Sequence, residues 1–200
     1  FLRSMGNHCD LGGLSSKVQE IGDVLAASGK DFIFFETVGV GQGEHDIINV
    51  ADISIVVLVP ESGDEIQLMK AGLIEIADVF VINKSDREGA NRIASTLKNI
   101  LHVFKPKNKL EPPVFNTIAN RDEGISELFK GIGSFLDLMN NKGILESRRL
   151  ERYRKRVYDI IRNQLEDSFW SSDKIDRLHQ FTKKLDRTTI APHVIAKNLL

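Results

Sequence analysis

Cysteine is nearly absent, since the 200-residue chain holds a single one, Cys9. One thiol cannot form an internal disulfide, and no apolar run approaches the roughly 18 residues that a membrane-spanning helix needs. We therefore expect a soluble protein of a reducing compartment with no membrane segment. An excess of positive charge is also missing: 27 Lys and Arg face 28 Asp and Glu, for a net charge of −1. This balance gives no global basic surface for nucleic acid.

The chain begins with Phe1 and carries no initiator methionine or signal peptide, so we expect a fragment whose first strand starts upstream. Four short apolar runs follow, at residues 32–35, 53–59, 79–82 and 114–115. Their hydrophobic residues are continuous rather than alternating. Continuous runs of this length favour strands covered on both faces, as in a parallel sheet.

Stretches with helical periodicity separate these runs, for example Ile93, Leu97 and Ile100. Strands that alternate with amphipathic helices predict an α/β fold with a doubly wound, mostly parallel sheet. Ligands of such sheets bind beyond the carboxyl ends of the strands. The composition changes at residues 140–143, so we expect a sheet domain over residues 1–140 and a helical arm over 141–200.

The arm starts with a basic run that acidic residues interrupt, which predicts a solvated helix face rather than a nucleic-acid patch. The run comprises Arg148, Arg149, Arg152, Arg154, Lys155 and Arg156. Near the end, Thr188 and Thr189 precede Pro192, a pattern that predicts a capped short helix closing at Leu200.

The strongest local signal is Asn83-Lys84-Ser85-Asp86, directly after the 79–82 strand. Two carboxylate oxygens of Asp86 match the N1–H and 2-amino donors of guanine, whereas adenine offers an acceptor and a C–H there. Asn83 would tie neighbouring loops together, and the stem of Lys84 would lie along the base. Backbone N–H groups of residues 116–119, including Thr117 and Ala119, would approach guanine O6.

A glycine-rich stretch at residues 36–44 follows the 32–35 run. Glycine lets a backbone approach a phosphate, so Gly39 would donate its N–H to a γ-phosphate and register its loss. Glu36 would hold a Mg²⁺-bound water. By analogy with other GTPases, Gln42 would orient the attacking water.

A third strand-end segment covers residues 60–70. Asp64 either caps the following helix or belongs to a functional loop, and the two interpretations are equally supported. Lys70 would swing toward developing phosphate charge, as an arginine finger does. The five histidines are scattered and lack ligand spacing with Cys9, so we expect no transition-metal site.

Together these residues resemble the family of G-protein chaperones for adenosylcobalamin-dependent methylmalonyl-CoA mutase, also described as arginine/ornithine transport kinases. The resemblance covers the whole chain and rests chiefly on the seven-residue motif at 36–42. Further matching segments are Arg3-Ser4 with residues 11–13, Gly63-Asp64-Glu65 with Gln67 and Lys70, residues 76–78, residues 83–86 and residues 192–200.

The resemblance implies a GTPase of the SIMIBI class of P-loop proteins, using GTP, GDP and Mg²⁺, that dimerises through its helical arm. It implies delivery of adenosylcobalamin to methylmalonyl-CoA mutase and protection of that enzyme. The location would be the bacterial cytoplasm, or the mitochondrial matrix in a eukaryote. Residues of the switch that would sense the partner are Gly41, Glu44, Gly63, Asp64, Glu65 and Gln67.

The phosphate-binding pattern Gly-x-x-x-x-Gly-Lys-Ser/Thr does not occur in the sequence. We therefore expect it upstream, and expect this chain alone not to hydrolyse GTP. Two other functions stay open. A metal-inserting GTPase would require Cys/His clusters, and a non-catalytic dimerisation module would lack the upstream loop altogether.

Overall fold

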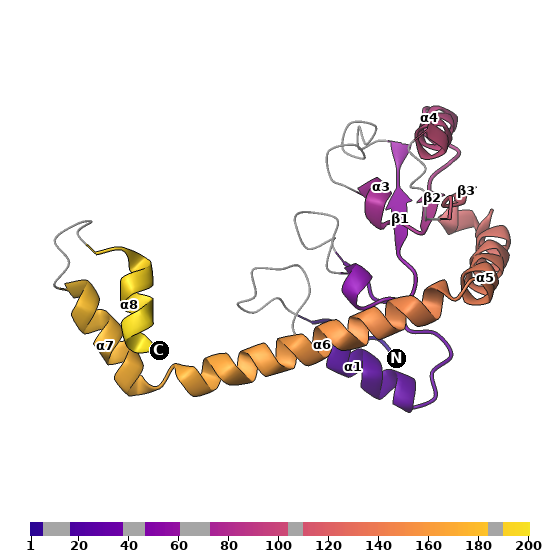
Figure 1. Cartoon of the computed structure of the whole chain (residues 1–200). Coiled ribbons are helices and arrows are strands. Elements are labelled where there is room, and N and C mark those ends of the chain that lie inside the picture. The colour runs from indigo at the N-terminus through magenta and orange to yellow at the C-terminus, as the bar shows by residue number, and fades with distance from the viewer. Residues whose placement is uncertain (6–16, 38–46, 61–72, 104–109, 184–189) are drawn as a thin grey trace. The chain divides into compact units, whose positions relative to one another are not determined.

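The computed structural model describes residues 1–5, 17–37, 47–60, 73–103, 110–183 and 190–200, which divide into two compact units, Phe1–Arg149 and Leu150–Leu200. The first unit holds a parallel sheet in the order β1-β2-β3 (Figure 1). Its elements are α1 (Val18–Ala27), β1 (Ile55–Leu58), α3 (Leu73–Ile76), β2 (Val79–Ile82), α4 (Ala90–Val103), β3 (Val114–Asn116), η3 (Ala119–Arg121), α5 (Ile125–Asn141) and the start of α6 (Ile144–Phe169). The predicted α/β class with a parallel sheet is confirmed.

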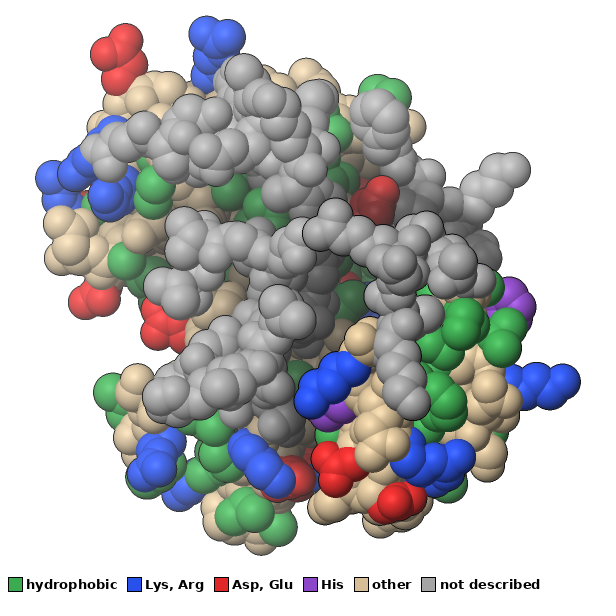
Figure 2. Space-filling view, turned by 90° about the vertical axis from the view of Figure 1, so that its left-hand side faces the viewer, with side chains coloured by type: hydrophobic (Ala, Val, Ile, Leu, Met, Phe, Trp, Pro, Cys, Tyr) green, Lys and Arg blue, Asp and Glu red, His purple; other side chains and the backbone are tan. Residues whose placement is uncertain are grey.

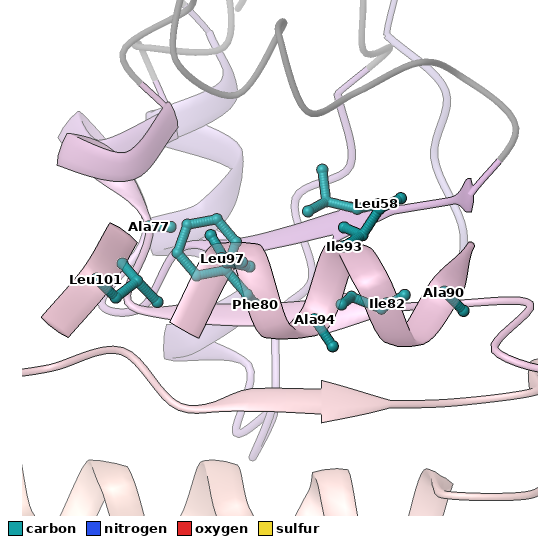
Figure 3. Packing of buried hydrophobic residues seen from close by; sticks show 9 residues of the cluster. All are labelled: Leu58, Ala77, Phe80, Ile82, Ala90, Ile93, Ala94, Leu97 and Leu101. Atoms are coloured by element: carbon teal, nitrogen blue, oxygen red, sulfur yellow. The ribbon is translucent and has the colours of Figure 1, made fainter. Parts of the chain in front are cut away.

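The central strand β2 is covered on both faces, and its four residues are at most 3% exposed. Phe80 and Ile82 pack with α4 residues in one apolar cluster (Figure 3). Val79 and Val81 belong to a second cluster, which α5 and Leu145 complete. Because successive side chains of a strand point to opposite faces, a strand between two helical layers needs apolar residues at every position. The continuous run at 79–82 meets this need.

The edge strand β1 departs from the sequence prediction. The expected run of 53–59 shortens to Ile55–Leu58, and Val57 remains 59% exposed while Leu58 is buried. The interpretation of this run as covered on both faces is therefore wrong. An edge strand has one neighbour in the sheet, and in the described part of the molecule the helical layers leave one of its faces partly open.

The predicted strand at residues 32–35 is also wrong, because the structure gives it no strand hydrogen bonds. Phe34 is 85% exposed, and the ring of Phe32 instead packs 6.0 Å from that of Phe129 on α5. A strand needs a neighbour for its backbone N–H and C=O groups. The three-stranded sheet of the described residues supplies none for this segment.

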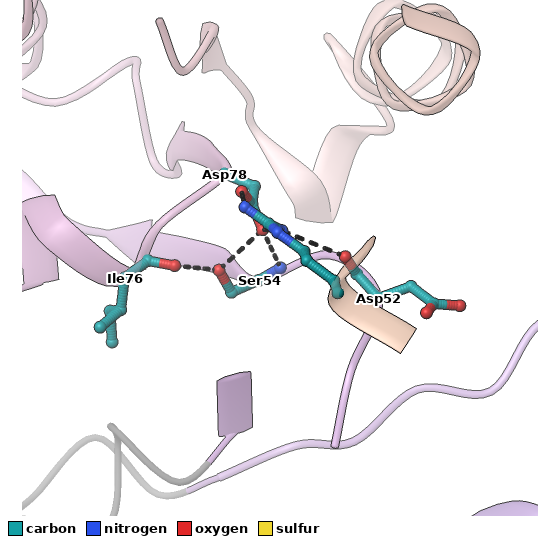
Figure 4. A network of polar contacts seen from close by, with 5 residues as sticks. Asp52, Ser54, Ile76 and Asp78 are labelled. Atoms are coloured by element: carbon teal, nitrogen blue, oxygen red, sulfur yellow. Dashed lines mark hydrogen bonds and ion pairs between the residues drawn. The ribbon is translucent and has the colours of Figure 1, made fainter. Parts of the chain in front are cut away.

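A buried carboxylate joins the amino ends of β1 and β2 to α6 (Figure 4). Asp78 is 8% exposed, and its Oδ2 accepts hydrogen bonds from the backbone N–H of Ser54 at 3.0 Å and from the Ser54 hydroxyl at 3.2 Å. The guanidinium of Arg148 donates to both oxygens of Asp78, at 2.8 Å each. This bidentate ion pair fixes the first turns of α6 to the sheet.

Arg149 makes a second pair beside the first one, with the carboxylate of Asp52 at 2.8 and 3.1 Å. The hydrogen bond and the charge of Asp52 raise the pKa of the Arg149 guanidinium, and burial opposes them in part. The prediction of a solvated basic face is therefore wrong for Arg148, while Arg149 stays 62% exposed as it pairs with Asp52. Both arginines attach the helix to acidic residues of the sheet unit.

The second unit contains the remainder of α6 with α7 (Ser172–Lys183) and α8 (Pro192–Leu199). Ile195 and Leu199 of α8 are buried, and Arg177 of α7 donates to the carbonyl of Asn198 at 3.3 Å. The closing helix is confirmed with its early proline, but Ala191 stands at its N-cap and provides no side-chain cap. Within the described ranges, every helix is too short or too polar to cross a bilayer.

We predict that Asp78→Ala lowers the free energy of unfolding by roughly 3–5 kcal/mol, because it removes the buried carboxylate that pairs with the Arg148 charge. The double variant Asp78→Ala/Arg148→Met should lose less free energy of unfolding than the two single variants lose together, by at least about 1 kcal/mol. Urea denaturation measures all three variants.

A matched control is Arg162→Ala, which breaks an exposed pair with Asp159 within the same helix. Its cost should stay below about 1 kcal/mol. Additive losses in the double variant would show that Asp78 and Arg148 do not stabilise each other.

Candidate functional site

The polar loops that follow β2 and β3 lie at the same edge of the sheet, because the two strands are parallel neighbours. Residues 83–86 leave β2, and residues 117–119 leave β3. The backbone joins the loops directly: the N–H of Ser85 donates to the carbonyl of Thr117 at 3.0 Å, and the N–H of Thr117 to that of Ile82 at 2.9 Å. The carboxyl edge of the sheet is thus a connected platform.

The side chain of Asn83 connects the two loops a second time. Its Oδ1 accepts hydrogen bonds from the Thr117 hydroxyl at 3.2 Å and from the Ala119 N–H at 3.1 Å. Thr117 is only 2% exposed, so its hydroxyl depends on this protein acceptor. The loop tie predicted for Asn83 is present.

The backbone N–H groups that the sequence analysis assigned to guanine O6 already have protein acceptors. Thr117 donates to Ile82, and Ala119 donates to Asn83. The N–H of Ile118 donates to the carbonyl of Glu123 at 3.0 Å. In this structure these residues hold the loop together rather than presenting free donors.

Lys84 turns the chain sharply after Asn83, with a φ of +55° that a residue with a side chain rarely adopts. The turn continues with a hydrogen bond from the N–H of Arg87 to the carbonyl of Lys84 at 3.0 Å. Asp86 lies within it, and its side chain keeps 34% of its surface exposed. A guanidinium nitrogen of Arg121, at the end of η3, lies 3.4 Å from Asp86 Oδ2.

Gly124 packs closely against the backbone of the loop that follows β3. It adopts a φ of +76°, and a Cβ at this position would lie 2.3 Å from the carbonyl oxygen of Asn116 and 3.2 Å from the Cα of Thr117. Both atoms are backbone and cannot rotate away. Only glycine satisfies the close approach and the left-handed conformation together.

The structure thus brings together five of the predicted residues: Asn83, Lys84, Asp86, Thr117 and Ala119. Glu36 is exposed, in the segment that follows Phe35, and is not part of the hydrogen-bonded loops. No group of three or more potential metal ligands occurs among the residues that the structure describes. The other predicted residues lie outside the described ranges: Gly39, Gly41, Gln42, Glu44, Gly63, Asp64, Glu65, Gln67 and Lys70.

Charges of both signs share the visible surface. Among the coloured side chains of Figure 2, Lys and Arg are interspersed with Asp and Glu and with hydrophobic ones. The charges of these described residues therefore mark no nucleic-acid surface.

Comparison with known proteins assigns the chain to a family. The family model described as methylmalonyl-CoA mutase-associated GTPase MeaB matches residues 1–174. The chain belongs to the MeaB family. The loops at residues 83–86 and 117–119 lie within the matched segment.

Individual relatives match the whole chain. A Pyrococcus abyssi protein with a provisional GTPase name is 36% identical over 203 residues, covering 100% of this chain and 63% of its own length. GTPase ArgK of Escherichia coli is 29% identical over 208 residues, with 100% and 62% covered. The chain thus spans less than two thirds of the length of these relatives.

A solved structure supports the fold. The crystal structure of a LAO/AO transport system kinase has a TM-score of 0.69 and 25% identity, covering 90% of this chain and 60% of that one. The parallel sheet and its helices therefore have the same fold as this kinase structure.

Two features of the site were not predicted from the sequence. The pairing of Arg121 with Asp86 joins residues from different loops, and no local pattern announces it. Gly124 follows Asp122 and Glu123 in a polar turn, and this composition was a signal for a tight turn at that point.

We predict that Asn83→Ala destabilises the MeaB-family protein by about 1–3 kcal/mol, because the buried Thr117 hydroxyl and the Ala119 N–H lose their shared acceptor. Asn83→Asp keeps an oxygen at the same position and should lose less. Denaturation of both variants in urea tests the loop tie, and equal losses would exclude it.

We also predict that Gly124→Ala lowers the free energy of unfolding by about 1–3 kcal/mol or more, from the strained φ and the backbone clash. Gly133→Ala is the matched control, because a Cβ there meets nothing within 4 Å in the middle of α5. This control should be neutral or stabilising by about 0.5–1 kcal/mol. The account of Gly124 fails if both variants unfold at the same denaturant concentration.

Proposed function

We propose that the full-length protein binds and hydrolyses GTP and acts as a chaperone of methylmalonyl-CoA mutase. In this role it gates the delivery of adenosylcobalamin and protects the mutase. The observation that carries the proposal is the tie from Asn83 to Thr117 and Ala119, beside which Asp86 offers a partly exposed carboxylate at the ligand edge.

Guanine recognition follows from the chemistry of Asp86. An ionised carboxylate only accepts hydrogen bonds, and guanine offers two adjacent donors, N1–H and the 2-amino group. Adenine presents an acceptor and a C–H at those positions, so it offers the carboxylate no hydrogen-bond donor. A site built to pair with such donors rejects bases that lack them. In this proposal, the stem of Lys84 lies along the base.

Thr117 and Ala119 have a supporting role in this proposal. Their N–H groups donate to Ile82 and Asn83, so we assign these residues to holding the base loop in shape. Asn83 then acts as a positioning residue, because it joins the loop of Asp86 to the loop that closes the other side of the base.

The phosphate side of the site rests on residues from the glycine-rich stretch and the third strand end. Glu36, an exposed carboxylate, fits the preference of Mg²⁺ for hard oxygen donors and would hold it through a water. Bound Mg²⁺ would neutralise charge on the phosphates. Gly39 would sense the γ-phosphate, Gln42 would orient water, and Lys70 would stabilise developing charge.

The partner and the oligomeric state are proposals of the same kind. The family description names methylmalonyl-CoA mutase, and a mouse relative, 28% identical over 205 residues, is named methylmalonic aciduria type A homolog, mitochondrial. On α6 of the second unit, an exposed apolar stripe favours packing against a second copy of the chain. Its members are Leu150, Tyr153, Val157, Ile160, Ile161 and Leu165.

We predict that Asp86→Asn weakens GDP binding by roughly 1–3 kcal/mol, about five- to 150-fold, and strengthens binding of xanthosine diphosphate. The asparagine carbonyl still accepts from N1–H, and its amide donates to the 2-oxo group of xanthine. Isothermal titration calorimetry of the full-length protein with both nucleotides and with ADP measures the change.

Asp122→Asn is the matched control, because Asp122 lies in the neighbouring turn with a φ of +56° that asparagine tolerates. It should leave the preference for GDP intact. Equal affinity of the unaltered protein for GDP and ADP would contradict the proposed function.

A further inference from the structure

Arg121 and Asp86 form an ion pair at the edge of the proposed base site. The pair joins two loops, since Asp86 follows β2 and Arg121 ends η3 after β3. The recorded contact is between one guanidinium nitrogen and a single carboxylate oxygen, Oδ2, at 3.4 Å. Asp86 therefore has a cationic neighbour within the protein.

The loop tie builds this contact into the fold. Ala119, the first residue of η3, donates to Asn83, and the N–H of Arg121 donates to the carbonyl of Ile118 at 2.9 Å. The first hydrogen bond ties η3 to the turn of residues 83–86, and the second closes η3 itself, so the backbone that carries Arg121 is held beside that turn. The side chain of Arg121 is 57% exposed and can leave the carboxylate without disturbing this backbone.

We propose that Arg121 is a specificity-determining residue, whose guanidinium competes with the 2-amino group of guanine for Oδ2 of Asp86. The inference rests on the proposed guanine site and adds a residue to it. In this proposal guanine uses both carboxylate oxygens, and its 2-amino group takes the place of the single Arg121 contact at Oδ2. Hypoxanthine, which lacks the 2-amino group, needs only the other oxygen and leaves the ion pair in place.

The competition narrows the preference for guanine over hypoxanthine. Inosine diphosphate binds with Arg121 still paired, while GDP binds at the expense of that pair. An exposed ion pair contributes little free energy, so the effect on affinity is about two- to fivefold. The ratio of the affinities for GDP and inosine diphosphate (IDP) is then smaller than it would be if guanine formed its two hydrogen bonds without displacing Arg121.

The test is calorimetric titration of the full-length protein and of its Arg121→Gln variant with GDP and with inosine diphosphate. We expect Arg121→Gln to bind GDP about two- to fivefold more tightly and inosine diphosphate no more tightly, so the ratio of the two affinities rises by that factor. The matched control is Arg162→Gln, which removes an arginine from an exposed pair with Asp159 in α6. The control should keep the original ratio.

Ionic strength provides a second measurement that needs no variant. Salt screens an exposed ion pair, and the two nucleotides carry the same diphosphate, so its own salt dependence cancels in the ratio. Raising the salt concentration should move the GDP/IDP ratio of the unaltered protein toward that of Arg121→Gln.

An unchanged ratio in Arg121→Gln, or a ratio that salt does not move, overturns the role of Arg121. In that case the guanine site itself stands if GDP is still preferred to ADP and Asp86→Asn abolishes this preference. Loss of both preferences in the unaltered protein would instead overturn the proposed function.

Discussion

The burial of β2 is the constraint on which the rest of the described sheet unit depends. Its four residues have almost no exposed surface, and they divide alternately between a cluster with α4 and a cluster with α5. A shift of one position along this strand would exchange the two sets of side chains. The register with β1 and β3 is therefore fixed, and the polar residues at both ends of β2 have fixed places.

The two ends of β2 serve different purposes. At the amino end, Asp78 binds Arg148 and holds the first turns of α6 against the sheet. At the carboxyl end, Asn83 gathers Thr117 and Ala119, and Asp86 lies at the surface beside Arg121. Structural attachment and proposed ligand recognition thus lie at opposite ends of one strand.

Much of this arrangement could be predicted from the sequence because its causes are local. The apolar run at 79–82 and the motif of residues 83–86 next to it indicated a buried parallel strand with a polar loop at its carboxyl end. The same motif predicted that Asn83 ties neighbouring loops together. These predictions needed only the period of the side chains and the chemistry of one motif.

The errors and omissions concern contacts between distant parts of the chain. Residues 32–35 have the composition of a strand, but a strand exists only where a neighbour accepts its hydrogen bonds. Arg148 lies in a charged run that suggested solvent, yet a buried carboxylate 70 positions earlier binds it. Arg121 meets Asp86 only because two loops converge. No local pattern encodes such pairings.

A crystal structure of the full-length protein with GDP tests the central claim most directly. The account predicts that the guanine base lies beside residues 83–86, with its N1–H and 2-amino group donating to the carboxylate of Asp86 and with Arg121 moved off Oδ2. A base bound elsewhere, with Asp86 still paired to Arg121, would contradict it.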